Sequence, residues 1–436
     1  MLIPDEPALD PAALFAPIAH LHTIGLAISG GADSLALMLL YARWMPSGTK
    51  PRAIVYTLDH GLRSEAKDEA EMVMCEAGRL GLEARALHWD GSRFQTRRQQ
   101  EARAARYRLI GDAMRADSAQ VLLTAHHQRD QAETVLMRLA RGSGTTGLGA
   151  MHPFSCVDGV NIFRPLLDVP AETLFDLVQQ AGLSPAVDPS NADPAYERVR
   201  WRQALPEFAA LGLDEAALAL VARRARRIDG LAERLVDQFI AKHLSLDSLG
   251  IVRVDRAALE QADAEIIVRV IGRMIEIASG QRCDALASIE ALAGRLAEEK
   301  SFAATLAGAS LVANDNGVMV SREAGRMNVA LRHLAAGERC FWDGRFDIAA
   351  SVPVVIAPGA DLTRAQYKAS VGGELSGPVA ALRAAPVIST PDGTILAIGA
   401  HVVGDGVAVS QPTLTSSLRS CRNRTSTGAA ALVSPE

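Results

Sequence analysis

The first 150 residues alternate short apolar runs with stretches that carry a helical pattern. Runs of strand length occur at 24–28, 53–58, 85–89 and 121–124, and helical patterns occupy 65–80 and 97–116. Strands that alternate with helices are typical of a parallel sheet, because each parallel pair needs a crossover connection. We therefore predict an α/β domain built on a parallel, Rossmann-like sheet, spanning residues 1–205.

The pattern changes twice in the rest of the chain. From 206 to 332 it is rich in Ala and Leu at helical spacing and ends in a hairpin signal at Asn316-Gly317. Beyond 333, Asp-Gly pairs separate short β runs, and the last residues are small and polar. We predict a mainly helical domain at 206–332, a small β-rich domain at 333–415 and a flexible tail at 416–436.

A glycine turn directly follows the first predicted strand. It reads Ser29-Gly30-Gly31-Ala32-Asp33-Ser34, and a second apolar stretch comes after it. Such a turn at a helix N-terminus exposes backbone N–H groups that bind phosphate oxygens, and glycines let the backbone approach an anion closely. The spacing matches neither a Walker loop nor a GxGxxG turn. The turn favours a nucleotide site, and an ordinary turn with serine caps is the alternative.

Polar residues also follow two other predicted strands. Asp59-His60 comes after the run at 53–58, and His126-His127 comes after the run at 121–124. In open α/β sheets, ligands bind outside the carboxyl ends of the strands. We therefore expect the glycine turn and these two pairs to form one site.

Two acidic residues begin the helix that follows His127. Asp130 and Glu133 are three residues apart, so both project from one face of its first turn. Acidic residues at a helix start are often only caps or partners of the helix dipole. Beside a nucleotide site, Asp130 and Asp33 become candidate metal ligands, and Glu133 becomes a candidate for binding an amine.

The composition excludes several classes of protein. The N-terminus lacks the basic region of a signal peptide, and no apolar segment is long enough to span a bilayer. The five cysteines are scattered without a CxxC pair, which argues against a zinc or iron–sulfur site and for reduced thiols. We expect a cytoplasmic protein with no membrane partner. No pattern fixes the oligomeric state, and a homodimer stays open.

Local charge differs from the overall charge. The net charge is −5, yet arginines are clustered at 93–108 and at 223–227. Clustered arginines on an acidic protein suit a polyanion that docks on one face. A solvated helix face explains either cluster alone equally well.

Taken together, these motifs resemble the tRNA(Ile)-lysidine synthetases of the PP-loop ATP pyrophosphatase superfamily. The similar segments cover roughly the first 205 residues and lie at 29–34, 59–63, 105–107, 124–134, 141–144, 147–148, 164–167, 188 and 190–191. The later domains resemble the family's accessory domains only loosely. The resemblance implies a PP-loop ATP-binding catalytic domain at 1–205 and a tRNA-binding role for 206–332.

The resemblance implies a ligase reaction in two steps. ATP adenylates the C2 carbonyl oxygen of the wobble cytidine in a CAU anticodon and releases pyrophosphate. The ε-amine of L-lysine then attacks C2 and displaces AMP, which gives lysidine and changes codon reading from AUG to AUA. The implied co-substrates and partners are ATP, Mg²⁺, L-lysine and tRNA(Ile).

The resemblance also implies residue roles. Asp33 and Asp130 would hold Mg²⁺, His126 would contact the α-phosphate or the adenylate, and Glu133 would bind the ammonium of lysine. Arg106 and Arg198 would steady phosphate or the nucleotide base. The implied ATP-binding residues are Ser29, Gly30, Gly31, Ala32, Asp33, Ser34, Asp59 and His60.

Two positions depart from the family pattern. The family usually has paired aspartates where this chain has Arg129 and Asp130, and an Arg-Asn pair where it has Arg198 and Val199. We expect the first aspartate to be peripheral to the site. The change to Val199 removes one hydrogen-bonding side chain and leaves the arginines in place.

Four rival functions fit the sequence less well than this resemblance. Iron–sulfur tRNA thiolases need closely spaced cysteines, and glutamine-dependent PP-loop enzymes need an ammonia-generating domain, neither of which the sequence shows. A cytidine deaminase needs the HxE…PCxxC zinc signature, which is also missing. Retention of Asp33, Asp130 and Glu133 together argues against a non-catalytic binding protein.

Overall fold

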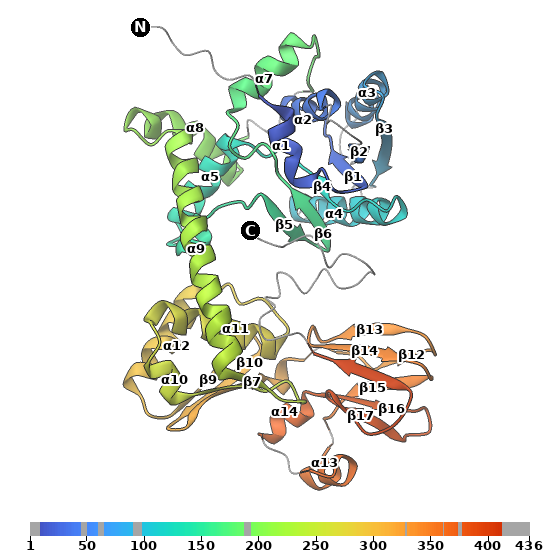
Figure 1. Ribbon diagram of the computed structural model, residues 1–436, viewed down its shortest axis with the longest axis vertical. Coiled ribbons are helices and arrows are strands. Elements are labelled where there is room, and N and C mark those ends of the chain that lie inside the picture. The colour runs from blue at the N-terminus through green and yellow to red at the C-terminus, as the bar shows by residue number, and fades with distance from the viewer. Residues whose placement is uncertain are drawn as a thin grey trace. The chain divides into compact units, whose positions relative to one another are not determined.

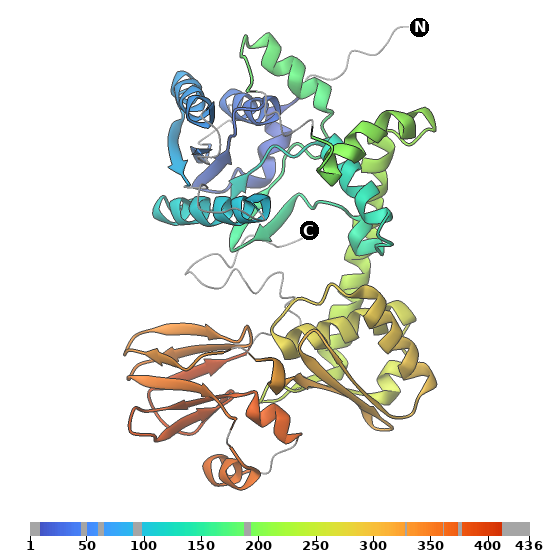
Figure 2. The same cartoon turned by 180° about the vertical axis from the view of Figure 1, so that it is seen from behind.

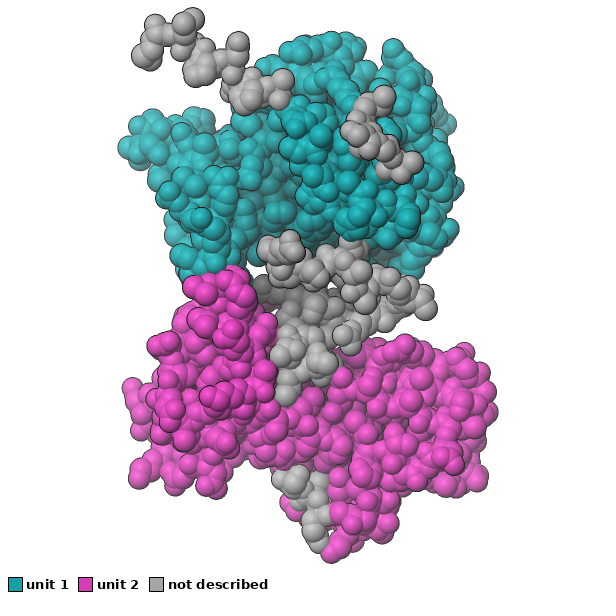
Figure 3. Space-filling view, viewed as in Figure 1, with its two compact units in different colours: residues 1–229, 422–436 teal, residues 230–421 magenta. Residues whose placement is uncertain are grey.

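The computed structural model describes residues 9–44, 50–59, 65–89, 98–186, 193–327, 329–360, 362–373 and 377–411, without the side chains of 65–66 and 98–106. The described residues fall into two compact units, one up to Asp229 and one from Gly230 onward (Figure 3). Several predictions fall outside the described part: His60, the side chain of Arg106, the segment 188–191 and the tail at 416–436.

The first unit is built on a six-stranded sheet in the order β3-β2-β1-β4-β6-β5 (Figure 1). Its strands are β1 (Thr23–Ala27), β2 (Arg52–Asp59), β3 (Glu83–His88), β4 (Leu122–Leu123), β5 (Phe154–Val157) and β6 (Val160–Phe163). Neighbouring strands are parallel except for the antiparallel pair of β5 and β6. The predicted parallel α/β fold is confirmed. The strand order reverses between β1 and β4, which is where ligands bind in such sheets.

Alternate residues of β2 enter two different cores, one on each face of the sheet. Val55 belongs to the core formed with α2 (Ala32–Arg43) and α7 (Ala171–Gln180). Ile54 and Tyr56 pack instead with α4 (Arg98–Ala116), on the face seen in Figure 2. The run at 53–58 is continuously apolar because both faces of the strand are covered. The remaining helices on this sheet are α1 (Pro11–Phe15), η1 (Ala16–Ile18) and α3 (Glu65–Arg79).

Three helices form a separate small core beside the sheet. Helix α5 (Gln128–Leu139) packs on α8 (Glu197–Ala210) and on the start of α9 (Glu215–His243) through Val135, Leu136, Leu205, Leu218 and Ala222. The short helix α6 (Thr145–Leu148) follows α5. Helix α9 begins in the first unit and ends in the second. This packing fixes the orientation of the first turn of α5, which carries the acidic residues.

The second unit contains a sheet that the sequence pattern did not predict. A five-stranded antiparallel sheet, in the order β7-β8-β11-β10-β9, packs against the apolar face of α11 (Ala264–Ser279). Its strands are β7 (Leu244–Leu246), β8 (Val252–Asp255), β9 (Phe302–Leu306), β10 (Ala309–Asn314) and β11 (Gly317–Arg322), and its other helices are α10 (Arg256–Glu260) and α12 (Leu286–Glu298). The predicted hairpin at Asn316-Gly317 joins β10 to β11. Residues 206–332 are therefore mixed α and β and not mainly helical as predicted. The prediction differed because short alanine-rich strands such as β9 resemble helical sequence.

The end of the described chain is rich in β structure, as expected. One five-stranded sheet has the order β12-β15-β16-β17-β18, and β13, β14 and β19 form a second sheet. The elements are η4 (Ala324–Arg326), β12 (Arg332–Leu334), β13 (Arg339–Trp342), β14 (Phe346–Ala350), β15 (Val354–Pro358), α13 (Arg364–Val371), α14 (Val379–Arg383), β16 (Pro386–Ser389), β17 (Ile395–Ile398), β18 (His401–Val402) and β19 (Val407–Ser410). Within the described residues, no helix is long and apolar enough to cross a membrane.

Candidate active site

The glycine turn connects β1 to α2 at the point where the strand order reverses. Gly30 has φ +88°, a backbone conformation that favours glycine, and a Cβ there would lie 3.1 Å from Cε of Met72. Inside the turn, Oγ of Ser34 donates to the carbonyl oxygen of Gly31 at 2.9 Å and accepts from the backbone N–H of Ser29 at 3.2 Å. Gly31 is the N-cap of α2 and offers no side-chain cap. The first N–H groups of α2 are therefore suited to bind an anion.

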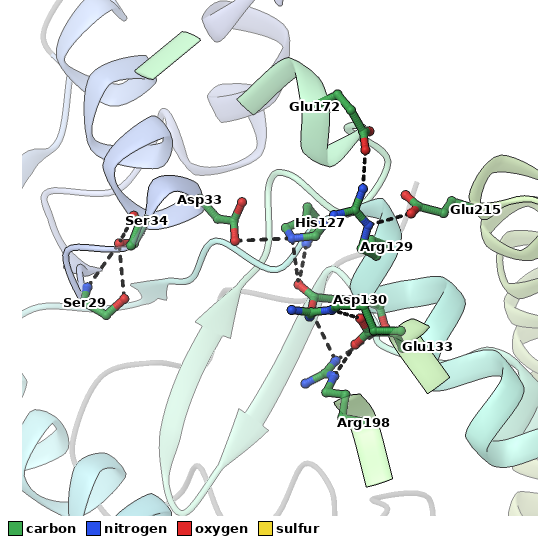
Figure 4. Close-up of polar contacts among 12 residues, drawn as sticks. Ser29, Asp33, Ser34, His127, Arg129, Asp130, Glu133, Glu172, Arg198 and Glu215 are labelled. Carbon is green, nitrogen blue, oxygen red and sulfur yellow. Dashed lines mark hydrogen bonds and ion pairs between the residues drawn. The ribbon is translucent and has the colours of Figure 1, made fainter. Parts of the chain in front are cut away.

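His127 connects the glycine turn to the start of α5. Its Nε2 lies 3.4 Å from Oδ2 of Asp33 and 3.6 Å from Oδ2 of Asp130 (Figure 4). The backbone N–H of His127 also donates to Oδ2 of Asp130 at 3.1 Å, which caps α5. Asp33 and Asp130 come from two different strand ends and meet at one imidazole. Two of the three strand ends that the sequence predicts in one site therefore meet at His127.

The electrostatics of this cluster favour charged groups. Burial by itself lowers the pKa of His127, but its hydrogen bond to Asp33 and the charges of Asp130 and Asp33 outweigh burial and raise the pKa above its ordinary value. Burial by itself raises the pKa of Asp130, but the charges of His127, Arg198 and His126 outweigh it and lower the pKa. The contacts between His127 and Asp130 therefore favour the charged form of each group.

Glu133 lies one turn further along α5 and is completely buried. Its Oε2 accepts from Nε of Arg198 at 2.6 Å, and its Oε1 accepts from Nε of Arg202 at 2.6 Å. An incoming ammonium would have to share this carboxylate with at least one guanidinium. The contact between Glu133 and the amine of lysine stays a prediction.

The other strand-end residues have nearby partners of their own. Nδ1 of His126 lies 2.9 Å from Oγ1 of Thr124. Asp59 at the end of β2 lies 3.2 Å from Nδ1 of His88 on β3. The phosphate contacts expected of His126 and Asp59 stay predictions.

Arg129, the first departure from the family pattern, points away from the Asp33–Asp130 cluster. Its Nε donates to Glu215 at 2.6 Å, and its Nη2 pairs with Glu172 (Figure 4). Glu215 is the first residue of α9, and Glu172 belongs to α7. In this chain Arg129 therefore ties α5 to two neighbouring helices.

Sequence reasoning missed two residues that support the site. Arg202 contacts Glu133, and its spacing of four residues from Arg198 on a helix could have indicated a shared face. Gln131 holds the backbone of Met151 through two hydrogen bonds of 2.8 and 2.9 Å. Nothing in the local pattern points to that contact, because Met151 lies beyond the next loop.

The arginine cluster at 223–227 divides into two kinds of side chain. Arg226 is half-buried, and its Nη1 donates to the carbonyl oxygens of Gly149 and Met151 at 2.9 and 3.1 Å. Burial lowers its pKa. Arg223, Arg224 and Arg227 are exposed. Only the exposed three can meet a polyanion, since Arg226 holds the loop after α6.

The first unit has a parallel sheet with a serine- and glycine-rich turn at its switch point. Acidic residues that follow a second strand lie close to this turn. These features define a PP-loop nucleotide-binding protein. The family model of the PP-loop domain matches residues 10–208. The chain is 39% identical over 330 residues to the tRNA(Ile)-lysidine synthase of a Bradyrhizobium species, and the match covers 71% of this chain and 92% of that protein. It is 44% identical over 291 residues to the tRNA(Ile)-lysidine synthase of Rhodopseudomonas palustris, covering 65% of this chain and 83% of that protein. The chain belongs to the tRNA(Ile)-lysidine synthase family.

Proposed function

We propose that the protein is an ATP-dependent ligase that joins L-lysine to C2 of the wobble cytidine in tRNA(Ile) with a CAU anticodon. The C2 carbonyl oxygen of the cytidine attacks the α-phosphorus of ATP, and pyrophosphate leaves. The ε-amine of lysine then attacks C2, loses a proton, and displaces AMP. The observation that carries this proposal is the meeting of Asp33, His127 and Asp130 beside the phosphate-binding turn, in a chain of this family.

The residues present fit a bound Mg²⁺. This ion prefers oxygen ligands and is usually held by one or two carboxylates together with substrate phosphates and water. Asp33 and Asp130 supply two carboxylates, and among the described residues no set of three or more His, Cys, Asp and Glu side chains could hold a metal alone. When bound, Mg²⁺ would offset charge on the phosphates as pyrophosphate leaves.

The chain's own groups supply the remaining steps. The N–H groups at the start of α2 bind phosphate oxygens at the glycine turn. His127 connects Asp33 to Asp130, and its backbone N–H caps the first turn of α5. The protein would act in the cytoplasm, where tRNA and ATP are present.

Incorporation of lysine into tRNA tests the proposal. Labelled lysine, ATP, Mg²⁺ and unmodified tRNA(Ile) with a CAU anticodon should yield acid-stable label in the tRNA. The matched control is the same tRNA with uridine in place of the wobble cytidine, which should stay unlabelled. A folded sample that leaves both tRNAs unlabelled would contradict the proposed reaction.

The exposed arginines of α9 give a second expected result. Replacing Arg223, Arg224 and Arg227 together by glutamine should weaken tRNA binding and reduce its salt dependence, since each lost phosphate contact removes about 0.7–0.9 from the logarithmic slope. Filter binding over a range of salt concentrations measures this slope. Arg79→Gln, at an exposed arginine of α3 that pairs with Glu76, is the control and should leave the slope unchanged. An unchanged slope in the triple variant would leave these arginines as a solvated helix face.

A further inference from the structure

Arg198 and Arg202 lie one turn apart on α8 and share a single buried carboxylate. Glu133 accepts from Nε of each arginine at 2.6 Å and has no exposed surface, whereas each arginine side chain is 38% exposed. Two guanidiniums therefore share one buried carboxylate, and both keep part of their surface accessible.

The terminal nitrogens of both arginines are directed toward the proposed reaction site. Nη2 of Arg198 lies 3.5 Å and Nη2 of Arg202 lies 4.0 Å from Oδ1 of Asp130. Among the described residues, Nη1 of neither arginine has a hydrogen-bond partner. Glu133 holds Nε of each guanidinium, and Nη2 of Arg198 donates to the carbonyl oxygen of Asp130 at 3.5 Å. Nη1 of each arginine is therefore left for another acceptor.

We propose that Arg202 is a second anion-contacting residue beside Arg198, and that Glu133 is a positioning residue that holds both guanidiniums toward one oxyanion of the substrates. The planar guanidinium matches the geometry of phosphate and carboxylate oxygens. Arg198 also lies in the first turn of α8, where the helix dipole favours negative charge. This inference rests on the proposed function.

The oxyanion has two possible sources in that reaction, the α-phosphate of ATP and the α-carboxylate of lysine. Both are bidentate acceptors, and both must be held near the adenylated cytidine. They differ in the step that they affect. A phosphate contact acts already in adenylation, whereas a carboxylate contact acts only when lysine enters.

Steady-state kinetics of Arg202→Met, Arg202→Lys and Glu133→Gln separate these sources. Exchange of pyrophosphate into ATP, measured with tRNA and without lysine, reports adenylation, and lysine transfer reports the second step. For a phosphate contact, Arg202→Met should raise the KM for ATP in exchange about ten- to a hundredfold, as expected when a hydrogen bond between charged groups is lost. For a carboxylate contact, the same variant should raise the KM for lysine and abolish the preference for lysine over lysinamide.

Two further variants distinguish positioning from a merely structural role. Glu133→Gln should change the same KM as Arg202→Met, and Arg202→Lys should restore part of the loss because it keeps the charge. Arg200→Met is the matched control on the same helix, since Arg200 donates to the carbonyl oxygens of Pro194 and Ala195 instead. It should match wild type in both assays.

Two results would overturn the inference. One is a folded Arg202→Met that leaves the KM values for ATP and lysine and the preference over lysinamide unchanged. The other is a Glu133→Gln that weakens the use of lysine and lysinamide equally while pyrophosphate exchange persists, since Glu133 would then bind the amine directly. Failure of the proposed function itself looks different, because wild type would then incorporate no lysine at all.

Discussion

Replacing Asp130 by asparagine should lower the rate of adenylation by about a hundred- to a thousandfold, the range expected when charge stabilisation at a transferring phosphoryl group is lost. Asparagine keeps the size of the side chain and an oxygen that can accept from the N–H of His127, so α5 should stay capped. The variant lacks the negative charge that the proposed Mg²⁺ site needs. Exchange of pyrophosphate into ATP, measured over a range of Mg²⁺ concentrations, should show a lower maximum and a weaker response to Mg²⁺.

A second aspartate at a helix start provides the matched control for this substitution. Oδ1 of Asp214 accepts from the backbone N–H of Ala217 at 2.7 Å at the beginning of α9. Asp214→Asn therefore makes the same chemical change at an N-cap without touching His127 or Arg198. It should keep the wild-type exchange rate. If Asp130→Asn also kept its rate and its Mg²⁺ response, Asp130 would be a helix cap and not a metal ligand.

The convergence of the site was predictable because parallel strands end at one edge of the sheet. Asp33 and His127 follow β1 and β4, which are neighbours, and the sequence placed both directly after apolar runs. The choice between His126 and His127 was not predictable in the same way. The structure places Nε2 of His127 within 3.6 Å of a carboxylate oxygen of each aspartate, whereas Nδ1 of His126 lies beside Thr124.

The contacts of Glu133 and Arg129 could not be predicted from local pattern. Arg198 and Arg202 reach Glu133 because α5 and α8 pack on each other through a small apolar core that includes Leu136 and Leu205. Helical periodicity identifies an apolar face but not the helix that covers it. For the same reason, the sequence does not predict the two carboxylate partners of Arg129, which lie on other helices.

The alanine-rich strands of the second unit show that hydrophobic periodicity alone does not always distinguish a strand from a helix. In β10 the burial alternates along Ala309–Asn314, which is the signature of a strand with one covered face. Alanine, however, is a strong helix former, and it occupies two of the three buried positions of β10, Ala309 and Ala313. Pairing with β9 and β11 therefore outweighs local propensity here.

In the second unit, Asp343 is the residue whose replacement should destabilise the protein most through charge. Its carboxylate accepts from Nε of Arg322 at 3.0 Å and from Nε of Arg345 at 2.9 Å. Both arginines are 2% exposed, and burial lowers the pKa of Arg345 to about 10. Two buried guanidiniums thus depend on a single carboxylate for compensation.

Asp343→Asn should lower the free energy of unfolding of this unit by about 3–5 kcal/mol, because it leaves buried charges without their partner. Asp343 has φ +48°, and asparagine tolerates this left-handed conformation, so the substitution adds little backbone strain. Urea denaturation followed by circular dichroism should show the loss in the transition of the second unit. Asp347→Asn is the control, because its pair with Arg339 is largely exposed on the arginine side and should be worth at most about 1 kcal/mol.

Asp343 packs against residues 206–332, for which the family resemblance implies a role in tRNA binding. A Cβ on Gly280, at the end of α11, would lie 2.3 Å from the carbonyl oxygen of Asp343. The turn that contains Asp343 therefore packs directly against the end of α11. Loosening that contact should free the β-rich part while leaving the glycine turn of the first unit intact. Asp343→Asn should therefore raise the KM for tRNA but not the KM for ATP. If the unfolding free energy stayed within about 1 kcal/mol of wild type, the two arginines would not depend on Asp343. If the KM for ATP rose alone, the contact at Asp343 would not support the use of tRNA.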